Sequence, residues 1–226
     1  MRAQTRQIAA FLGMCAALCL SAGAQANVQG LSIRVYYDPA PPSFSNIIPT
    51  NASVDATQSY IAGLTPAYTF LDTNAGFNFP AAFPRTIANF FGADAAGAAL
   101  TDTHSATYFA FDAVGFIQVS ASGSYTFAIP VVDDYARLTI DGTVVVQNAV
   151  FANALSPASA TLFLTAGEHS FDLFYVQGSF GSSLQYTVTS SIGTVSYDSV
   201  PEPASLALFG IGVSALCAAR RRHRCN

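Results

Sequence analysis

Asp133 and Asp134 are the neighbouring residues whose types and spacing most directly suggest chemistry. Two carboxylates can hold a hard divalent cation such as calcium, which takes about six to eight oxygen ligands. On a regular strand, however, adjacent side chains face opposite ways, so the pair would not normally reach one ligand. The alternative is that the pair caps a turn before Arg137, with one carboxylate accepting hydrogen bonds from local backbone amides.

Support for catalysis is thin. Between the two chain ends the only histidines are His104 and His169, which excludes a three-histidine zinc site, and no Lys is available for a phosphate loop or Schiff base. His169 precedes a predicted strand and fits a turn residue with local hydrogen bonds. Glycoside hydrolysis needs two carboxylates about 5 to 9 Å apart, and sequence cannot place any two of the acids relative to one another. The acids concerned are Asp102, Asp112, Asp141, Glu168 and Asp172. We expect no enzyme, and a glycosidase is the least favoured function.

The apolar residues that surround these positions have the spacing of β-strands. Every second residue is apolar in several runs, which places those side chains on one face. The clearest runs are Tyr125, Phe127 and Ile129, and Phe171, Leu173 and Tyr175. Asp141-Gly142 between two such runs predicts a two-residue hairpin. With no long segment of helical period from Asn27 to Val200, the sequence predicts an all-β fold, an antiparallel β-sandwich or flattened barrel.

The stretch from Asp38 to Pro84 is less regular because it is rich in proline. Proline removes hydrogen-bond donors from a sheet ladder, so this stretch predicts loops and short edge strands.

The first 26 residues have the layout of a secretory signal peptide. Arg2 and Arg6 precede an apolar run from Ile8 to Leu20, and Ala24-Gln25-Ala26 places small residues at a cleavage site. The secretion machinery is therefore an expected partner, and export the expected fate.

The other end has three parts in order: Pro201-Glu202-Pro203, an apolar run from Ala204 to Ala219, and a cluster that includes Arg220, Arg221 and Arg222. As a helix the run would be about 24 Å long, short for a bilayer core of about 30 Å. The arginines are expected to stay cytoplasmic.

These parts resemble the PEP-CTERM sorting signal of Gram-negative bacteria. The resemblance implies that an exosortase recognises and removes the tail at the inner membrane, which would hold the protein only transiently. Proteins of this family accompany exopolysaccharide production. The expected route ends at the cell surface or outside the cell.

Charge and cysteine content exclude some classes of partner and some kinds of chemistry for the domain between the two ends. Six of the nine arginines and Glu202 lie in the two ends, leaving three basic and twelve acidic residues, a formal net charge of −9. Such a balance argues against nucleic-acid binding, which depends on Lys and Arg. All four cysteines also lie in the ends, so disulfides and thiolate chemistry are excluded from the domain.

A second resemblance covers most of the domain. The motifs that carry it are Gly30-Leu31, Gly123 to Phe127, Asp133-Asp134, Arg137 to Gly142, Leu164 to His169, and the strand Phe171 to Tyr175. In this order they resemble the protective-antigen-type (PA14) domain, a β-sandwich of toxins, glycosidases and adhesins whose lectin branch binds sugars through calcium.

The resemblance implies that Asp133 and Asp134 are calcium ligands, joined by a cis peptide that turns both carboxylates to one ion. Further oxygens would come from the loop Gln177 to Ser183, and Asn148 and Asn153 are additional candidates. Tyr135 and Phe180 lie near loops and are the best candidates to stack on a sugar, the alternative being burial in the core.

The sequence thus predicts a signal peptide (1–26), a PA14-type β-sandwich (27–199) and a sorting signal (200–226). The predicted function is that of an exported, non-catalytic module that binds carbohydrate, with calcium as a cofactor. The alternative is a purely structural matrix protein whose aspartates hold a turn.

Overall fold

Strand pairing builds two sheets in the part of the chain that the computed structural model describes: residues 29–37, 51–73, 77–82, 86–92, 109–149, 158–178 and 181–199. All of these residues belong to one compact unit, Gln29–Val200. The predicted signal peptide (1–26) and sorting tail (200–226), with its short apolar helix, lie outside the described residues. Among the described residues, none of the helices has the length and apolarity needed to cross a membrane.

The larger sheet has seven strands in the order β2-β1-β4-β9-β6-β7, with β11 also paired to β4. Every pair is antiparallel. The bounds are β1 (Leu31–Tyr37), β2 (Tyr68–Asp72), β4 (Phe109–Val119), β6 (Tyr135–Ile140), β7 (Thr143–Ala149), β9 (Gly167–Gln177) and β11 (Val195–Asp198).

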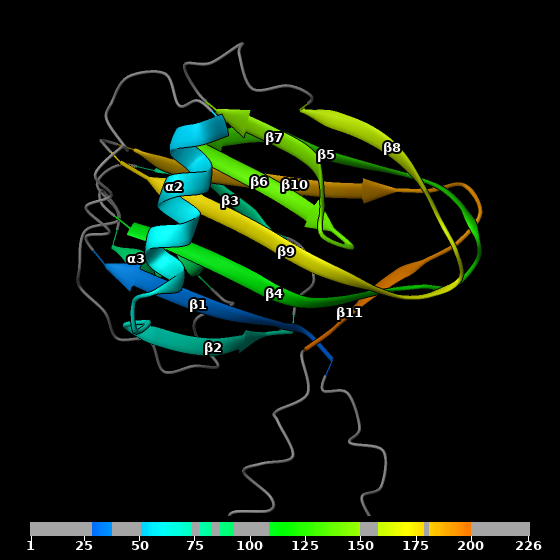
Figure 1. The fold of residues 1–226 in the computed structure, drawn as a ribbon, viewed down its shortest axis with the longest axis horizontal. Coiled ribbons are helices and arrows are strands. Elements are labelled where there is room, and N and C mark those ends of the chain that lie inside the picture. The colour runs from blue at the N-terminus through cyan, green and yellow to red at the C-terminus, as the bar shows by residue number, and fades with distance from the viewer. Residues whose placement is uncertain are drawn as a thin grey trace, which may run out of the picture. The chain divides into compact units, whose positions relative to one another are not determined.

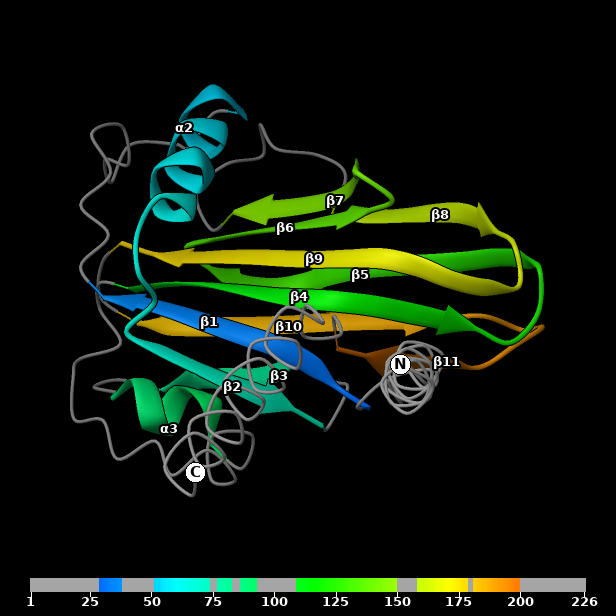
Figure 2. The same cartoon turned by 60° about the horizontal axis from the view of Figure 1, so that its bottom comes forward.

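The smaller sheet has four strands in the order β3-β10-β5-β8, again antiparallel. Its strands are β3 (Asn78–Ala82), β5 (Gly123–Asp133), β8 (Ser159–Leu164) and β10 (Ser182–Thr189). The two sheets form the two layers of a sandwich (Figures 1 and 2). The predicted all-β antiparallel sandwich is therefore confirmed.

The core lies between the sheets and is rich in aromatic rings. Tyr125, Phe127 and Ile129 of β5 are completely buried, as their alternation predicted. Across from them, Phe111 of β4 and Tyr175 of β9 stack with ring centroids 5.1 Å apart. Because buried aromatic side chains remove large apolar areas from water, this cluster can hold the sandwich together without disulfides.

The turn between β6 and β7 is the hairpin that Asp141-Gly142 predicted. Both residues have positive φ, 49° for Asp141 and 73° for Gly142. Two-residue hairpins of this kind need positive φ at both central positions, and Asp-Gly meets that need at little cost.

Two helices correct the prediction that the domain has no helical segment. α2 (Asn51–Ala62) and the short α3 (Ile87–Phe91) form in or beside the proline-rich stretch, where the predicted short edge strands are present as β2 and β3. In α2, Val54, Thr57 and Ile61 are buried. So narrow a buried stripe is hard to recognise as a helical period in the sequence.

α2 lies on the outer face of the larger sheet (Figures 1 and 2). It contributes to a second apolar cluster, outside the main core. The members of that cluster are Tyr36, Val54, Ile61, Ala110, Tyr135, Ala149, Phe174 and Val176. The larger sheet is thus buried on both faces where α2 covers it.

Candidate functional site

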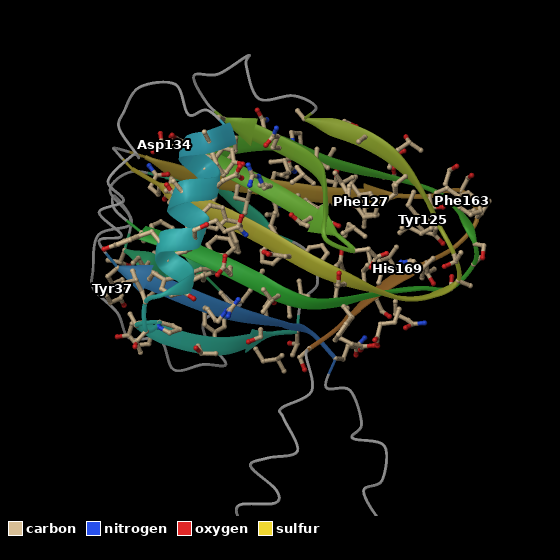
Figure 3. The ribbon with its side chains drawn as sticks, in the orientation of Figure 1. Tyr37, Tyr125, Phe127, Asp134, Phe163 and His169 are labelled. Atoms are coloured by element: carbon tan, nitrogen blue, oxygen red, sulfur yellow. The ribbon has the colours of Figure 1, made fainter. Side chains whose placement is uncertain are left out.

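Asp133 and Asp134 lie where the chain passes from one sheet to the other. Asp133 is the last residue of β5 in the smaller sheet, and β6 of the larger sheet begins directly after Asp134. The peptide bond between the two aspartates is cis, as the resemblance implied. Both side chains are half-buried. Figure 3 shows Asp134 at one end of the sandwich, away from the end that carries Phe163.

The loop after β9 lies beside the pair. The backbone N–H of Gly178 donates a hydrogen bond to Asp134 Oδ2 at 2.6 Å. On the far side of the loop, a Cβ added to Gly181 would lie 3.6 Å from Asp133 Oδ2. Gly178, Gly181 and Ser183 of the expected loop therefore lie beside the aspartates.

Tyr175 and Gln177 hold the backbone of Asp133 and the loop in place through hydrogen bonds. The Tyr175 hydroxyl can donate its proton to the backbone carbonyl of Asp133 or to Gln177 Oε1, which is 2.8 Å away. Gln177 Nε2 in turn donates to the carbonyl of Gly181 at 2.6 Å. This chain of contacts ties β5, β9 and the loop to one another around the aspartates.

Neither Tyr175 nor Gln177 was predicted in this supporting role. The available signal was a tyrosine among the inward positions of β9, because a buried phenolic hydroxyl needs a hydrogen-bond partner. Burial, and next the charges of Asp133 and Asp134, raise the pKa of Tyr175 well above its ordinary value. Its hydroxyl therefore stays protonated and available as a donor.

The electrostatics of the pair favour a bound positive charge. Burial, the negative charge of Asp134 and a hydrogen bond with the Asp134 side chain raise the pKa of Asp133 to about 7. Like charges at short range disfavour the doubly ionised state, so near neutral pH the pair takes up a proton or binds a cation.

The donor set suits a hard cation. Both side chains offer carboxylate oxygens, which calcium prefers, and carbonyl oxygens or water complete such sites. Among the described residues no group of three or more His, Cys, Asp and Glu side chains is placed to share a metal. Any further protein ligand in that part of the chain would be a backbone, amide or hydroxyl oxygen.

Asn148 is engaged elsewhere. Its Nδ2 donates to the carbonyl of Ile129 at 2.7 Å, and its Oδ1 accepts from the backbone N–H of Ala149 at 2.8 Å. The other amide candidate, Asn153, lies outside the described residues.

The stacking role expected for Tyr135 is corrected. Tyr135 is completely buried, packs against Phe174 at 6.3 Å between ring centroids, and donates its hydroxyl proton to Gln147 Oε1 at 3.4 Å. Its ring has no free face for a sugar, because the first position of β6 points under α2. The alternative of burial therefore holds for Tyr135, while Phe180 lies outside the described residues.

A second group of charged residues lies beneath α2, on the outer face of the larger sheet. Arg34 on β1 pairs with Asp112 on β4 at 3.5 Å, and Gln58 of α2 donates to Asp172 of β9 at 3.3 Å. Burial and the nearby Asp172 charge raise the pKa of Asp112 to about 7, against the opposing effect of Arg34. Asp112 and Asp172 are thus close neighbours in a structural network covered by a helix.

Asp141 and His169 join two turns. His169 Nδ1 lies 2.6 Å from Asp141 Oδ2, its Nε2 lies 2.9 Å from the carbonyl of Thr165, and the Ser170 N–H donates to Asp141 Oδ1 at 2.9 Å. Both ring nitrogens therefore face acceptors. His169 is therefore held by hydrogen bonds, as expected, but it lies within β9 and not in a turn, and its bond to Asp141 is not local.

Comparison with known proteins agrees with this fold. Residues 94–199 match the family model of the PA14 domain, and residues 199–222 match the PEP-CTERM protein-sorting motif. The fold is thus that of PA14 β-sandwich domains, and the two matched segments correspond in order to a PA14 domain and a PEP-CTERM sorting motif. No curated protein gives a significant match.

Solved structures show the same fold at low identity. A PA14 sugar-binding domain from an RTX adhesin is 19% identical with a TM-score of 0.55, covering 75% of this chain and 94% of that chain. The PA14 domain of the antifreeze protein MpAFP is 15% identical with a TM-score of 0.54, covering 81% and 97%. The A domain of epithelial adhesin 6 from Candida glabrata, in complex with Galβ1-3GlcNAc, is 13% identical with a TM-score of 0.55, covering 82% and 93%.

Proposed function

We propose that this protein is an exported surface protein whose PA14 domain binds carbohydrate without turning it over, with calcium held by Asp133 and Asp134. The observation that carries the proposal is the convergence of two half-buried carboxylates at one end of the sandwich, where burial and mutual repulsion raise the pKa of Asp133. A divalent cation offsets that repulsion, and calcium is the hard cation that best suits such oxygen donors.

Two of the similar structures, a sugar-binding domain of an adhesin and an adhesin domain in complex with Galβ1-3GlcNAc, support a carbohydrate ligand, and the sorting motif supports the route. In this proposal the secretion machinery exports the chain, the inner membrane holds it transiently, and an exosortase removes the tail before release to the surface. Exopolysaccharide is the proposed partner. Calcium would be held by Asp133 and Asp134, with Gly178, Tyr175 and Gln177 keeping the pair in position.

Three of the other carboxylates support a non-catalytic role. Asp112 is paired with Arg34, Asp172 accepts a hydrogen bond from Gln58 of α2, and Asp141 is bonded to His169. A glycosidase needs two accessible carboxylates on either side of a bond, and these acids do not provide that arrangement. No release of reducing ends from polysaccharides is expected.

The calcium proposal is tested by titrating calcium into chelated protein, with calorimetry and thermal unfolding. At about 100 times its dissociation constant, calcium should add about 2.7 kcal/mol and raise the unfolding midpoint by roughly 5 to 11 °C. The double change Asp133→Asn and Asp134→Asn should remove both the heat and the rise. Asp198→Asn, on β11 of the other sheet, should leave them unchanged.

If neither heat nor a rise occurs in the parent protein, the domain does not bind calcium at this site. The alternative of a purely structural matrix protein is favoured if glycan arrays also give no binding.

The sorting proposal has its own test, because replacing Pro201-Glu202-Pro203 by three alanines should leave the tail uncleaved. Mass spectrometry of the protein in cells that carry an exosortase measures that outcome.

A further inference from the structure

The outer face of the smaller sheet is free of charge. Its four strands, β3, β10, β5 and β8, contain no Asp, Glu or Arg among their residues except Asp133, which ends β5. The domain around this face carries an excess of acidic residues, with twelve acids and three arginines from Asn27 to Ser199. The domain as a whole is strongly acidic, but the outer face of its smaller sheet offers no charged side chain that could pair with a charged ligand.

Hydroxyl groups form cross-strand rows on this face. The register places Thr189 of β10 opposite Thr126 of β5, and Thr126 opposite Thr161 of β8. Thr126 Oγ1 and Thr161 Oγ1 are hydrogen-bonded at 2.8 Å. The next row pairs Ser124 with Phe163. β5 and β8 are paired over six residues without a bulge, which gives a continuous strip about 20 Å long.

One aromatic ring stands on this strip. Phe163 is 66% exposed, the largest exposed fraction among the large hydrophobic side chains of the described residues. Its neighbour Ser124 and the row of Thr161 and Thr126 supply donors and acceptors next to it. Figure 3 shows Phe163 at the end of the sandwich away from Asp134, so this surface is separate from the calcium site.

The chemistry of the strip fits a neutral polysaccharide. Sugar hydroxyls exchange hydrogen bonds with serine and threonine, which both donate and accept, and the apolar face of a sugar ring packs on an exposed aromatic ring. A second copy of this chain would find poor anchors, because serine is depleted in protein interfaces and serine and threonine are rare among their energetic hot spots. A neutral polymer also avoids the repulsion that two acidic domains would suffer.

We propose that the uncharged outer face of the smaller sheet, centred on Phe163, Thr161 and Thr126, is a second, calcium-independent surface that binds a neutral polysaccharide chain. This inference does not rest on the calcium site. The domain would then have two separate binding surfaces: the proposed calcium site at one end of the sandwich and the hydroxyl strip on the outer face of the smaller sheet.

The experiment measures binding of the full chain to cellulose, dextran and agarose in excess chelator by pull-down and affinity electrophoresis, with alginate as an acidic comparison. We expect retention on at least one neutral polymer and none on alginate, with little dependence on salt. Phe163→Ala should weaken retention at least about tenfold, since it removes the exposed ring from the contact. Thr126→Glu should weaken it similarly by placing a charge in the strip.

Matched controls separate this surface from the rest of the molecule. Tyr60→Ala removes another exposed aromatic ring, on α2, and should leave retention unchanged. The double change Asp133→Asn and Asp134→Asn should also leave it unchanged while abolishing any calcium response. Thermal unfolding of every variant confirms that it is folded.

The proposal is overturned if none of the neutral polymers binds in chelator, or if folded Phe163→Ala and Thr126→Glu proteins bind as the parent does. It is also overturned if sedimentation shows that the parent is a dimer and both variants are monomers, because the strip is then occupied by a second copy.

Discussion

The two outer faces of the sandwich carry different polar side chains, and in the described part of the chain a helix covers only one of the two faces. The larger sheet places Arg34, Asp112 and Asp172 on its outer face, which α2 covers in part: Gln58 of α2 contacts Asp172, whereas Arg34 stays partly exposed. The smaller sheet places threonine and serine on its outer face and leaves them exposed. Charges are expensive to bury unless they are paired, so the covered face needs an ion network, whereas hydroxyls remain stable in contact with water.

We expect the covered, charged face to serve stability and the exposed hydroxyl face to serve binding. The charged face is occupied by a helix of its own chain and is expected to respond strongly to substitution. The hydroxyl face contributes little to folding and is expected to tolerate substitution while changing binding. Four predictions test or sharpen this contrast, beginning with the largest effect.

The largest effect is expected for Arg137 on the covered face. Its side chain is 6% exposed and its Nη1 lies 2.5 Å from Oδ1 of Asp55, on α2. Arg137→Met leaves the half-buried Asp172 without this neighbouring positive charge, and we expect a loss of roughly 3 kcal/mol, or about 6 to 12 °C in the unfolding midpoint. Asp55→Asn should cost less than about 1 kcal/mol, since Asp55 is exposed. Equal effects of the two changes would show that Arg137 acts through its pair with Asp55 and not through Asp172.

The next effect is a pH dependence that originates on the covered face. The folded pKa of Asp112 is about 7, above its ordinary 3.8, so the folded state binds more protons than the unfolded state between about pH 4 and 7. The free energy of unfolding should therefore fall as pH rises through this window. Charged neighbours that set this behaviour are Asp172, which raises the pKa, and Arg34, which lowers it.

Asp112→Asn should flatten the pH dependence, measured by denaturant unfolding between pH 5 and 8. The slope that remains should come from Asp133, whose pKa is also about 7, and from Asp172 and His169, whose pKa values are raised as well. The part that belongs to Asp133 should shrink in saturating calcium. A slope that Asp112→Asn leaves untouched would place its origin away from the covered face.

A smaller effect is expected at the rim of the larger sheet, where His169 bridges two turns. Burial lowers its pKa, but the carbonyl of Thr165 and the carboxylate of Asp141 outweigh this, so the net pKa is raised above 6.5. The stabilising contribution is therefore complete below pH 6.5 and is lost as pH rises through the folded pKa. His169→Gln should remove under about 1 kcal/mol at pH 5 and less at pH 8. NMR titration of the imidazole measures the pKa directly, and a value below 6.5 would contradict this assignment.

The smallest effect is expected on the hydroxyl face. Thr161→Val keeps the shape of the side chain and removes one hydroxyl from a solvent-exposed pair with Thr126. Its effect on stability should stay within about 0.5 kcal/mol. Thermal unfolding of this variant beside Arg137→Met gives the contrast between the two faces in one measurement. A large loss in Thr161→Val would mean that the hydroxyl rows hold the sheet together.

Much of the fold was predictable because the formation of a strand or a hairpin depends on residues that are close together in the sequence. Alternation in β5 and β9 and the Asp141-Gly142 turn each depend on residues a few positions apart, and each prediction was confirmed. α2 was missed because its buried stripe is narrow and its partners belong to distant strands. Tyr135 was misassigned for a similar reason, since nearness to a loop in sequence says nothing about a helix packed over it.

The sequence by itself determined the strand pattern, the acidic and cysteine-free composition of the domain, and the PEP-CTERM tail, all of which depend on residue type and order. Only the tertiary structure decided which carboxylates meet. Asp112 and Asp172 are brought together by the pairing of β4 with β9, and Gly178 reaches Asp134 because β9 returns beside β6. These neighbours are far apart in the chain, and the register that joins them is set by burying the aromatic core, a property of all the strands together.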